Sequence, residues 1–337
     1  MATHLEIHVR EIPKGTLSRE HFSEQQVETP APGPGEVLVR TLWLSIDAAN
    51  RAWMQGATYR EAVTAGNFMH GYALGEVAAV GDGTAGHQVG DYVMGELGWR
   101  EFAVMRADRL IPVGAARPLS HHLSVLGIAG QTAYMGLYSQ GQPTGDGQVM
   151  VVSAAAGSVG YIAGQIGKIH GCRVVGIAGG PEKCDWLTGE MGFDAAVDYK
   201  AGNLYKDLAA ACPEGVDLYF DNVGGPTLET VLFQMRNFGH ITCCGAVSQY
   251  DTDSPAGVRG IPGLLVVKRL TMRGFVYMDH AAELNDRSIA DLSSWIASGQ
   301  LKVVEDVVEG LTSAPDGLIG LLAGNNRGKR LVRVGSE

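Results

Sequence analysis

The stretch that most constrains the fold of this 337-residue chain is a run of small residues between an apolar segment and a helical pattern. Gln148–Ser153 is apolar, Ala154–Gly160 is small, and Tyr161–His170 has the apolar spacing of a helix. A turn of this kind presents backbone N–H groups and the positive end of a helix dipole to a pyrophosphate. Gly157 would let the backbone approach the phosphates, and Gly160 would let the helix pack closely against the strand.

Alternating strands and helices around this turn strengthen the interpretation. The turn alone is a weak signal, because Ala155 stands where the usual fingerprint has its first glycine. Helix-length segments such as Pro181–Met191 alternate with further apolar runs. The runs that we interpret as strands are Gln148–Ser153, Arg173–Ala178, Ala195–Tyr199, Val216–Asn222, His240–Gly245 and Leu270–Phe275. This alternation predicts a doubly wound parallel sheet.

The first part of the chain has another pattern, in which short apolar runs are separated by glycines. These runs are Glu36–Leu44, Glu76–Val80 and Asp91–Met94. They predict a compact β-rich barrel or sandwich. The tail, Val303–Val334, has the pattern strand, turn, helix and strand, and we expect Leu331–Val334 to fold back onto the first domain. We therefore predict an α/β protein with domains at 1–122 and 123–298, followed by a returning segment at 299–337.

The end of the second predicted strand indicates which cofactor the turn would hold. NAD enzymes place an Asp or Glu about 20 residues after the turn, where it accepts hydrogen bonds from the ribose. This chain has Ile177-Ala178-Gly179-Gly180 there, without an acid. Lys183 follows in the first turn of the next helix, where its ammonium could meet a 2′-phosphate. The prediction is therefore NADP(H).

Composition excludes several classes of function. The net charge of −10 and the lack of a Lys/Arg run argue against nucleic acid as a partner. No apolar stretch approaches the ~20 residues that span a bilayer, and residues 1–11 carry charges where a signal peptide would be apolar. None of the five cysteines forms a C-x-x-C pair, and none precedes Cys172, so we expect neither a disulfide framework nor a zinc site. We expect a cytoplasmic protein.

Five motifs together resemble one known family. They are the Ala154-x-x-Gly157-x-x-Gly160 turn, Ala178–Lys183, Asp198–Lys200, Phe220–Gly225 and Gly324–Lys329. The set resembles the zinc-independent medium-chain dehydrogenase/reductases, in the branch of prostaglandin/leukotriene reductases, alkenal double-bond reductases and curcumin reductases. The resemblance implies a GroES-like first domain completed by the C-terminal segment, a Rossmann domain between them, and NADPH-dependent reduction of an activated carbon–carbon double bond. It also implies a dimer, and the edge of the last predicted strand, 270–275, could pair across a two-fold axis.

The resemblance also assigns residues to the cofactor. Lys183 and Tyr199 would hold the adenosine 2′-phosphate, Asn222 would lie along the cofactor, and Gly179 is a further cofactor-binding candidate. The remaining candidates for the pyrophosphate, the nicotinamide side and its cover are Gly157, Ser158, Val159, Gly160, Cys244, Gly245, Ala246, Val247, Ser248, Tyr250, Phe275, Val276, Tyr277 and Asn326.

Without a metal, the expected reaction needs hydrogen-bond donors for the enolate oxygen on which charge develops. The candidate donors are Tyr72, Tyr59 and the ribose hydroxyl of the cofactor. Tyr72 lies in a segment that carries an active-site tyrosine in plant members of the family. His70 and His87 are expected to be surface or packing residues.

The chain departs from the family at two positions. Ala49 stands where many relatives carry a tyrosine of the substrate pocket, and Val267 stands where animal and plant members carry a tyrosine assigned to enolate stabilisation. We therefore expect a less polar wall, made by Trp53, Met54 and Met69, and a substrate other than a prostaglandin.

Three functions remain open from the sequence. The first is an NADPH-dependent reductase of α,β-unsaturated aldehydes and ketones. The second is a quinone reductase on the same fold, which also needs no metal. The third is an NADP(H)-binding protein without turnover.

Overall fold

The computed structural model describes residues 2–114, 118–140 and 143–337. The chain divides into two compact units, each made of segments distant in the sequence. The β-rich unit comprises Met1–Ser124, Glu305–Asn325 and Arg330–Glu337, and the α/β unit comprises Val125–Val304 and Asn326–Lys329. No helix in the described ranges is long and apolar enough to cross a membrane.

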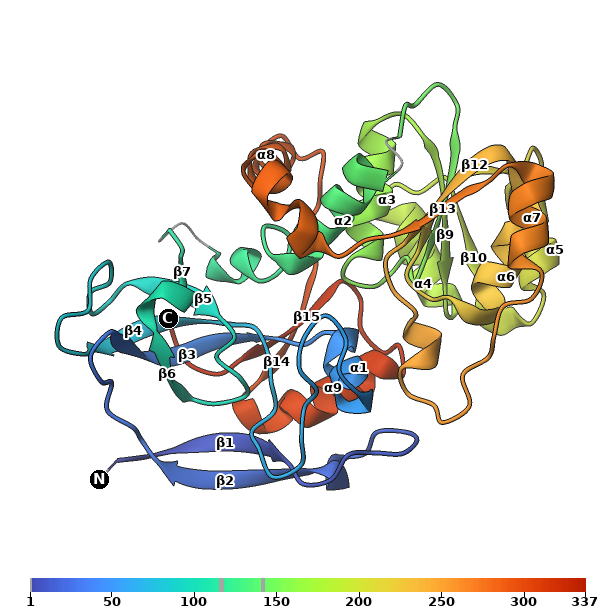
Figure 1. Cartoon of the computed structure of the whole chain (residues 1–337). Helices are drawn as coiled ribbons and strands as arrows, with labels where there is room; N and C mark the ends of the chain where they lie inside the picture. Colours follow the sequence, from blue (N-terminus) through green and yellow to red (C-terminus); the bar gives the residue numbers. More distant parts are fainter. Residues whose placement is uncertain (1, 115–117, 141–142) are drawn as a thin grey trace. The chain divides into compact units, whose positions relative to one another are not determined.

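The β-rich unit contains one antiparallel sheet and a separate hairpin (Figure 1). Its strands are β1 (Thr3–Val9), β2 (Phe22–Glu28), β3 (Glu36–Ser45), β4 (Ala73–Val80), β5 (Tyr92–Gly95), β6 (Phe102–Arg106), β7 (Ile111–Pro112), β14 (Glu305–Glu309) and β15 (Lys329–Arg333). The sheet has the order β14-β15-β3-β4-β5-β7, with β6 also paired to β3. The C-terminal strand β15 is antiparallel to β3, with Leu331 opposite Ser45. Two helices, α1 (Ala48–Gln55) and α9 (Ala314–Leu322), interrupt the strands.

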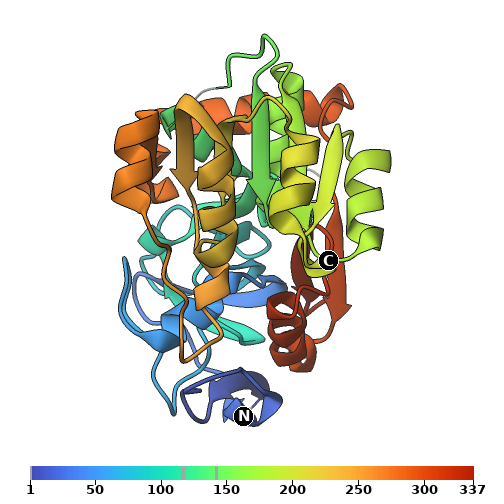
Figure 2. The same ribbon diagram turned by 90° about the vertical axis from the view of Figure 1, so that its right-hand side faces the viewer.

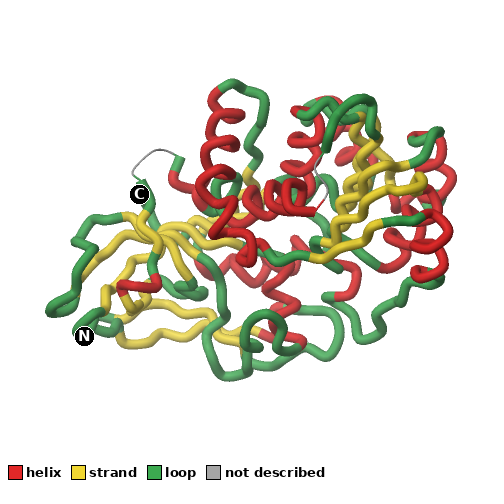
Figure 3. Tube along the Cα trace, turned by 45° about the horizontal axis from the view of Figure 1, so that its top comes forward, coloured by secondary structure: helices red, strands yellow, loops and turns green. Residues whose placement is uncertain are grey.

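The α/β unit is a six-stranded parallel sheet with helices on both faces (Figures 2 and 3). Its strands are β8 (Val149–Ser153), β9 (Arg173–Ala178), β10 (Ala195–Asp198), β11 (Val216–Asp221), β12 (Met235–Cys243) and β13 (Thr271–Gly274). Its helices are α2 (Ile128–Gln140), α3 (Gly160–Ile169), α4 (Pro181–Gly189), α5 (Leu204–Ala211), α6 (Gly225–Gln234), α7 (Ile261–Lys268) and α8 (Tyr277–Ala297). The predicted fold class, a GroES-like β-rich domain with a Rossmann sheet, is confirmed.

Two hydrophobic cores cover the two faces of this sheet. Successive residues of β8 alternate between them, as the pleat of a strand requires: Met150 and Val152 enter one core, and Val149 and Val151 enter the other. Helices α2, α3, α4 and α8 contribute to the first core, and α5, α6 and α7 to the second. Burial on both faces explains why the parallel strands appear in the sequence as continuous apolar runs.

The longest helix, α8, lies outside the elements that the sequence predicts. Its buried residues are Leu284, Ser288 and Leu292, spaced four apart, with charged residues between them. This spacing is a helical signal, but the polar Ser288 at its centre weakens it.

Candidate functional site

The strand order of the α/β unit places a ligand crevice at one point of its sheet. The order β10-β9-β8-β11-β12-β13 reverses direction between β8 and β11. Helices that follow these two strands lie on opposite faces, so the carboxyl ends of β8 and β11 open into a crevice, where doubly wound proteins bind their ligands. Ser153 ends β8 and Asp221 ends β11.

The predicted cofactor turn lies at this crevice. Ala154 has a φ of 46°, in the left-handed region that costs an alanine about 1 kcal/mol, and its carbonyl accepts from Gly157 N at 2.9 Å. Ala155, in place of the usual first glycine, is fully buried and donates its N–H to the Ile177 carbonyl. Helix α3 begins at Gly160, immediately after Ser158 and Val159, so its first N–H groups face the end of β8.

A segment from the end of the chain borders the turn. Gly328 N donates to the Ala156 carbonyl at 2.9 Å, and Gly328 forms an isolated parallel β-bridge with Gly157. Asn326 is buried and donates from Nδ2 to the Gly328 carbonyl. Asn326, a predicted cofactor residue, is thus fixed beside the turn by its own side chain.

Residues predicted for the 2′-phosphate converge between β9 and β10. A Cβ on Gly179 would lie 2.9 Å from the Tyr199 ring, so the two residues are in contact. Asp198 Oδ1 accepts from Gly180 N at 2.8 Å and from Lys200 N at 2.9 Å, which ties the end of β10 to the start of α4. Lys183 lies in the first turn of α4, and the Tyr199 side chain is about half exposed.

Residues predicted for the nicotinamide side converge on the ends of β11 and β12. The loop from Cys244 to Tyr250 is hydrogen bonded to the residues that follow β11. Its bonds are Val247 N to Asn222 O, Ser248 N and Oγ to Val223 O, and Cys244 N and Gly245 N to Asp221 O. Within the loop, Ala246 N donates to the Tyr250 hydroxyl at 3.0 Å.

Asn222 has a structural contact that the sequence does not predict. Its Nδ2 donates to Ser153 O at 2.8 Å, and its backbone N donates to Ser153 Oγ at 2.9 Å. The side chain therefore joins β11 to β8. These two bonds use neither Asn222 Oδ1 nor the second hydrogen of Nδ2, so a cofactor could contact either of them.

The predicted cover, Phe275–Tyr277, connects β13 to α8. Phe275 packs against α2, where a Cβ on Gly136 would lie 2.5 Å from the ring of Phe275 and 2.8 Å from that of Phe220. Val276 is the N-cap of α8 and Tyr277 its first residue. Packing against Gly136 fixes this segment at the carboxyl edge of the sheet.

The cysteines at this edge are thiols at neutral pH. Burial, followed by the nearby Asp221 carboxylate, raises the pKa of Cys243 to about 11 and that of Cys244 to about 12. A nucleophilic role needs the thiolate, so neither cysteine is suited to act as a nucleophile.

The predicted catalytic tyrosines belong to the β-rich unit. Tyr72 directly precedes β4, its carbonyl accepts from Ser45 N, and its ring packs against the cluster that contains Leu42, Leu74 and Leu331. Tyr59 lies in the loop between α1 and β4, with 56% of its surface exposed.

A charged cluster in the β-rich unit is not predicted by the sequence. Arg60 donates to both carboxylate oxygens of Glu96, at 2.8 and 3.1 Å, and stacks over Trp53. It also bonds His70 Nδ1 at 2.8 Å, and burial together with Arg60 lowers the pKa of His70 below its usual value. His70 is therefore neutral at pH 7, and because Arg60 can only donate, the His70 proton is on Nε2.

Ala49, the first departure from the family, lies at the start of α1. Asn50 Oδ1 accepts from Asp47 N, and its Nδ2 donates to His70 O at 3.0 Å. Arg51 is buried and donates to Gly15 O. Next to Ala49, the Asn50 side chain thus joins the start of α1 to the backbone of His70.

The predicted apolar wall needs correction. Met54 and Met69 are 2% and 0% exposed and belong to the core of the β-rich unit, so they line no surface that a substrate could reach. Trp53 is half-buried and stacks with Arg60. Val267, the second departure, is 67% exposed on α7.

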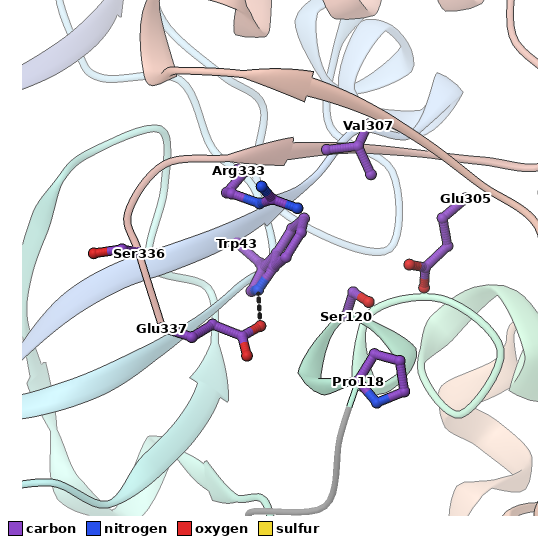
Figure 4. Close-up of a pocket in the computed structure, with 8 residues that line it drawn as sticks. All are labelled: Trp43, Pro118, Ser120, Glu305, Val307, Arg333, Ser336 and Glu337. Atoms are coloured by element: carbon purple, nitrogen blue, oxygen red, sulfur yellow. Dashed lines mark hydrogen bonds between the residues drawn. The ribbon is translucent and has the colours of Figure 1, made fainter.

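A cavity of about 610 Å³ lies in the β-rich unit, apart from the predicted residues (Figure 4). Trp43 donates from Nε1 to Glu337 Oε1 at 2.8 Å, and Arg333 lies over its ring. None of the predicted catalytic or cofactor residues lines it. Across the described residues, no group of three or more His, Cys, Asp or Glu could hold a metal ion.

Comparison with known proteins agrees with this architecture. Residues 6–113 match the N-terminal domain of oxidoreductases, and residues 158–295 match the family described as zinc-binding dehydrogenase. The chain is 38% identical to the NADPH-dependent curcumin reductase of Escherichia coli K12, over 96% of this chain and 95% of that protein. It is 38% identical to the NADP⁺-dependent 2-alkenal reductase of Nicotiana tabacum, over 90% and 89%.

A solved structure is similar over the whole chain. CurA from Vibrio vulnificus in complex with NADPH superposes with a TM-score of 0.94 and 36% identity, covering 99% of this chain and 100% of that one. The predicted cofactor, NADP(H), is confirmed by this likeness together with the NADP-dependent relatives.

Proposed function

We propose that this chain, which belongs to the medium-chain dehydrogenase/reductases in the branch of curcumin, alkenal and prostaglandin reductases, reduces the carbon–carbon double bond of α,β-unsaturated aldehydes and ketones. That it is an NADPH-dependent oxidoreductase follows from its relatives. The observation that supports the finer reaction is the 38% identity, over at least 90% of this chain, to proteins named as curcumin and 2-alkenal reductases.

When bound, NADPH would supply a hydride for the β-carbon of the substrate, and negative charge would then develop on the carbonyl oxygen. The chain's part is to bind both molecules, exclude water and stabilise the negative charge on that oxygen. Tyr72 is the residue that we assign to this oxygen, as a hydrogen-bond donor. A proton taken up from the solution then adds to the α-carbon, which gives the saturated aldehyde or ketone.

The test is NADPH oxidation with a panel of enals, enones and quinones, with identification of the products. Consumption of enals or enones with formation of the saturated carbonyl supports the proposal. Turnover of quinones alone would favour the alternative quinone reductase. NADPH binding without consumption of any substrate would favour a protein without turnover.

Tyr72→Phe is expected to lower kcat with an enone by about a hundredfold to a thousandfold, because one donor to the developing oxyanion is lost. The KM for NADPH should change little. Tyr59→Phe is the matched variant, and comparing the two assigns the donor. If both variants keep the kcat of the wild type, the tyrosines do not act as donors.

We also propose that the protein is a homodimer formed along β13. This strand is the last in its sheet, and apolar side chains on neighbouring elements are exposed: Phe238 (66%), Val266 (75%) and Val267 (67%). Light scattering should give twice the mass of one chain, and Val266→Glu should shift the protein towards the monomer, because a charge would be buried at the interface. A monomeric wild-type protein would contradict this proposal.

A further inference from the structure

A buried carboxylate occupies the point where the sheet reverses direction. Asp221 is the last residue of β11 and is 1% exposed. It lies beside Ser153, the last residue of β8, across the gap that defines the ligand crevice. A buried charge is costly unless hydrogen bonds replace its hydration, so its partners indicate what it is for.

Four donors converge on one oxygen of this side chain. Asp221 Oδ1 accepts from the Tyr219 hydroxyl at 2.7 Å and from Ser153 Oγ at 3.1 Å. It also accepts from Val223 N and Gly224 N, both at 3.0 Å. Burial and the Asp221 carboxylate raise the pKa of Tyr219 well above its usual value, so its hydroxyl keeps the proton that it donates.

The backbone of the same residue holds the next strand. Asp221 O accepts from Cys244 N at 2.8 Å and from Gly245 N at 3.1 Å, immediately after β12. Ser153, held by Asp221, accepts from Asn222 N on its hydroxyl and from Asn222 Nδ2 on its carbonyl. One residue therefore joins the carboxyl ends of β8, β11 and β12.

We propose that Asp221 is a positioning residue that shapes the nicotinamide side of the cofactor crevice, by fixing Asn222 and the 244–250 loop. This inference rests on the proposed assignment of those residues to the nicotinamide half of NADPH. Binding of the nicotinamide half would then depend on Asp221, whereas binding of the adenosine half would depend on other residues. Those include Gly179 and Tyr199, which meet between β9 and β10.

The separation makes a binding test possible with the purified full-length protein. Adenosine 2′,5′-bisphosphate carries the adenosine and 2′-phosphate but lacks the nicotinamide. Asp221→Ala leaves four hydrogen-bond donors without their acceptor. It should raise the Kd for NADPH by about tenfold or more, since hydrogen bonds to a charged group are stronger than those between neutral groups. The Kd for the bisphosphate should change by less than about twofold, as expected for sites that act independently.

Two milder variants keep the proposal testable if Asp221→Ala does not fold. Asp221→Asn retains an acceptor oxygen and should give an intermediate Kd for NADPH. Ser153→Ala removes a donor to Asp221 and an acceptor from Asn222, and it should shift the same ratio of the two dissociation constants in the same direction.

The matched control lies at the other end of the same strand. Asp217 Oδ2 accepts from Val149 N at 2.9 Å, so Asp217→Asn also weakens a bond between β11 and β8. It should lower the melting temperature and leave the ratio of the two dissociation constants unchanged. If the Asp221 variants weaken both ligands equally, or neither, the positioning role is overturned. If the protein binds both ligands but turns over only quinones, the proposed substrate class is refuted. The ratio of the two dissociation constants would still decide the role of Asp221.

Discussion

Lys183→Ala is expected to raise the KM for NADPH by about tenfold or more, since a charge-assisted hydrogen bond contributes about 1.5–3 kcal/mol. Lys183 lies in the first turn of α4, where its ammonium adds to the positive end of the helix dipole. The start of α4 is tied to the Tyr199 segment through Asp198. A 2′-phosphate placed between them would meet both residues.

The specificity of this effect can be measured with NADH, which has no 2′-phosphate. The KM for NADH should be the same in Lys183→Ala and in the wild type, so the preference for NADPH should fall. Lys168→Ala is the matched control, because it removes the same charge from another lysine. Lys168 lies on α3 and is paired with Asp194. An equal rise in KM for both cofactors would mean that Lys183 supports the fold and does not bind the 2′-phosphate.

Features with a local signal could be predicted from the sequence. The doubly wound sheet follows from runs such as Val149–Ser153, because a strand buried on both faces is apolar throughout. The cofactor turn follows from small residues at a fixed spacing. Helix α8 is amphipathic, but it has a serine on its buried face, and the pattern gives a weaker signal.

Features made by distant residues could not be predicted. Ser153 and Asp221 are 68 residues apart, and nothing in either segment indicates that they meet. Arg60, His70 and Glu96 likewise come together through the loops of the β-rich unit. Met54 and Met69 are predicted from the sequence to line the substrate pocket but are buried in the core. The sequence shows that these side chains are apolar, but only the packing shows whether they line a pocket or fill the core.

The two glycines of the cofactor turn are expected to fail in different ways when each is replaced by alanine. A Cβ on Gly160 would lie 2.3 Å from Ala154 O and 2.9 Å from Ala155 Cα, both backbone atoms. Ala154 is already held at a positive φ, so the turn has little room to relax. Gly160→Ala should therefore lower the free energy of unfolding by about 1–3 kcal/mol, the usual cost of overpacking. The clash outweighs the ~1 kcal/mol that alanine gains over glycine in a helix.

Gly157→Ala should mainly affect the cofactor. Its Cβ would lie 3.1 Å from Ala154 O, a tight contact that a small shift relieves. The methyl group would, however, occupy the side of the backbone that a pyrophosphate approaches, and we expect the Kd for NADPH to rise about tenfold, or ~1.4 kcal/mol. The melting temperature should stay close to that of the wild type.

Gly189→Ala is the control for both variants, because nothing lies within 4 Å of its Cβ position at the end of α4. Calorimetry and NADPH titration of the three variants separate packing from phosphate approach. A Gly160→Ala protein as stable as the wild type would mean that the turn can open, and the close approach of α3 to β8 would then not depend on glycine. Equal losses of stability in Gly157→Ala and Gly160→Ala would remove the distinction, and Gly157 would be a packing residue as well.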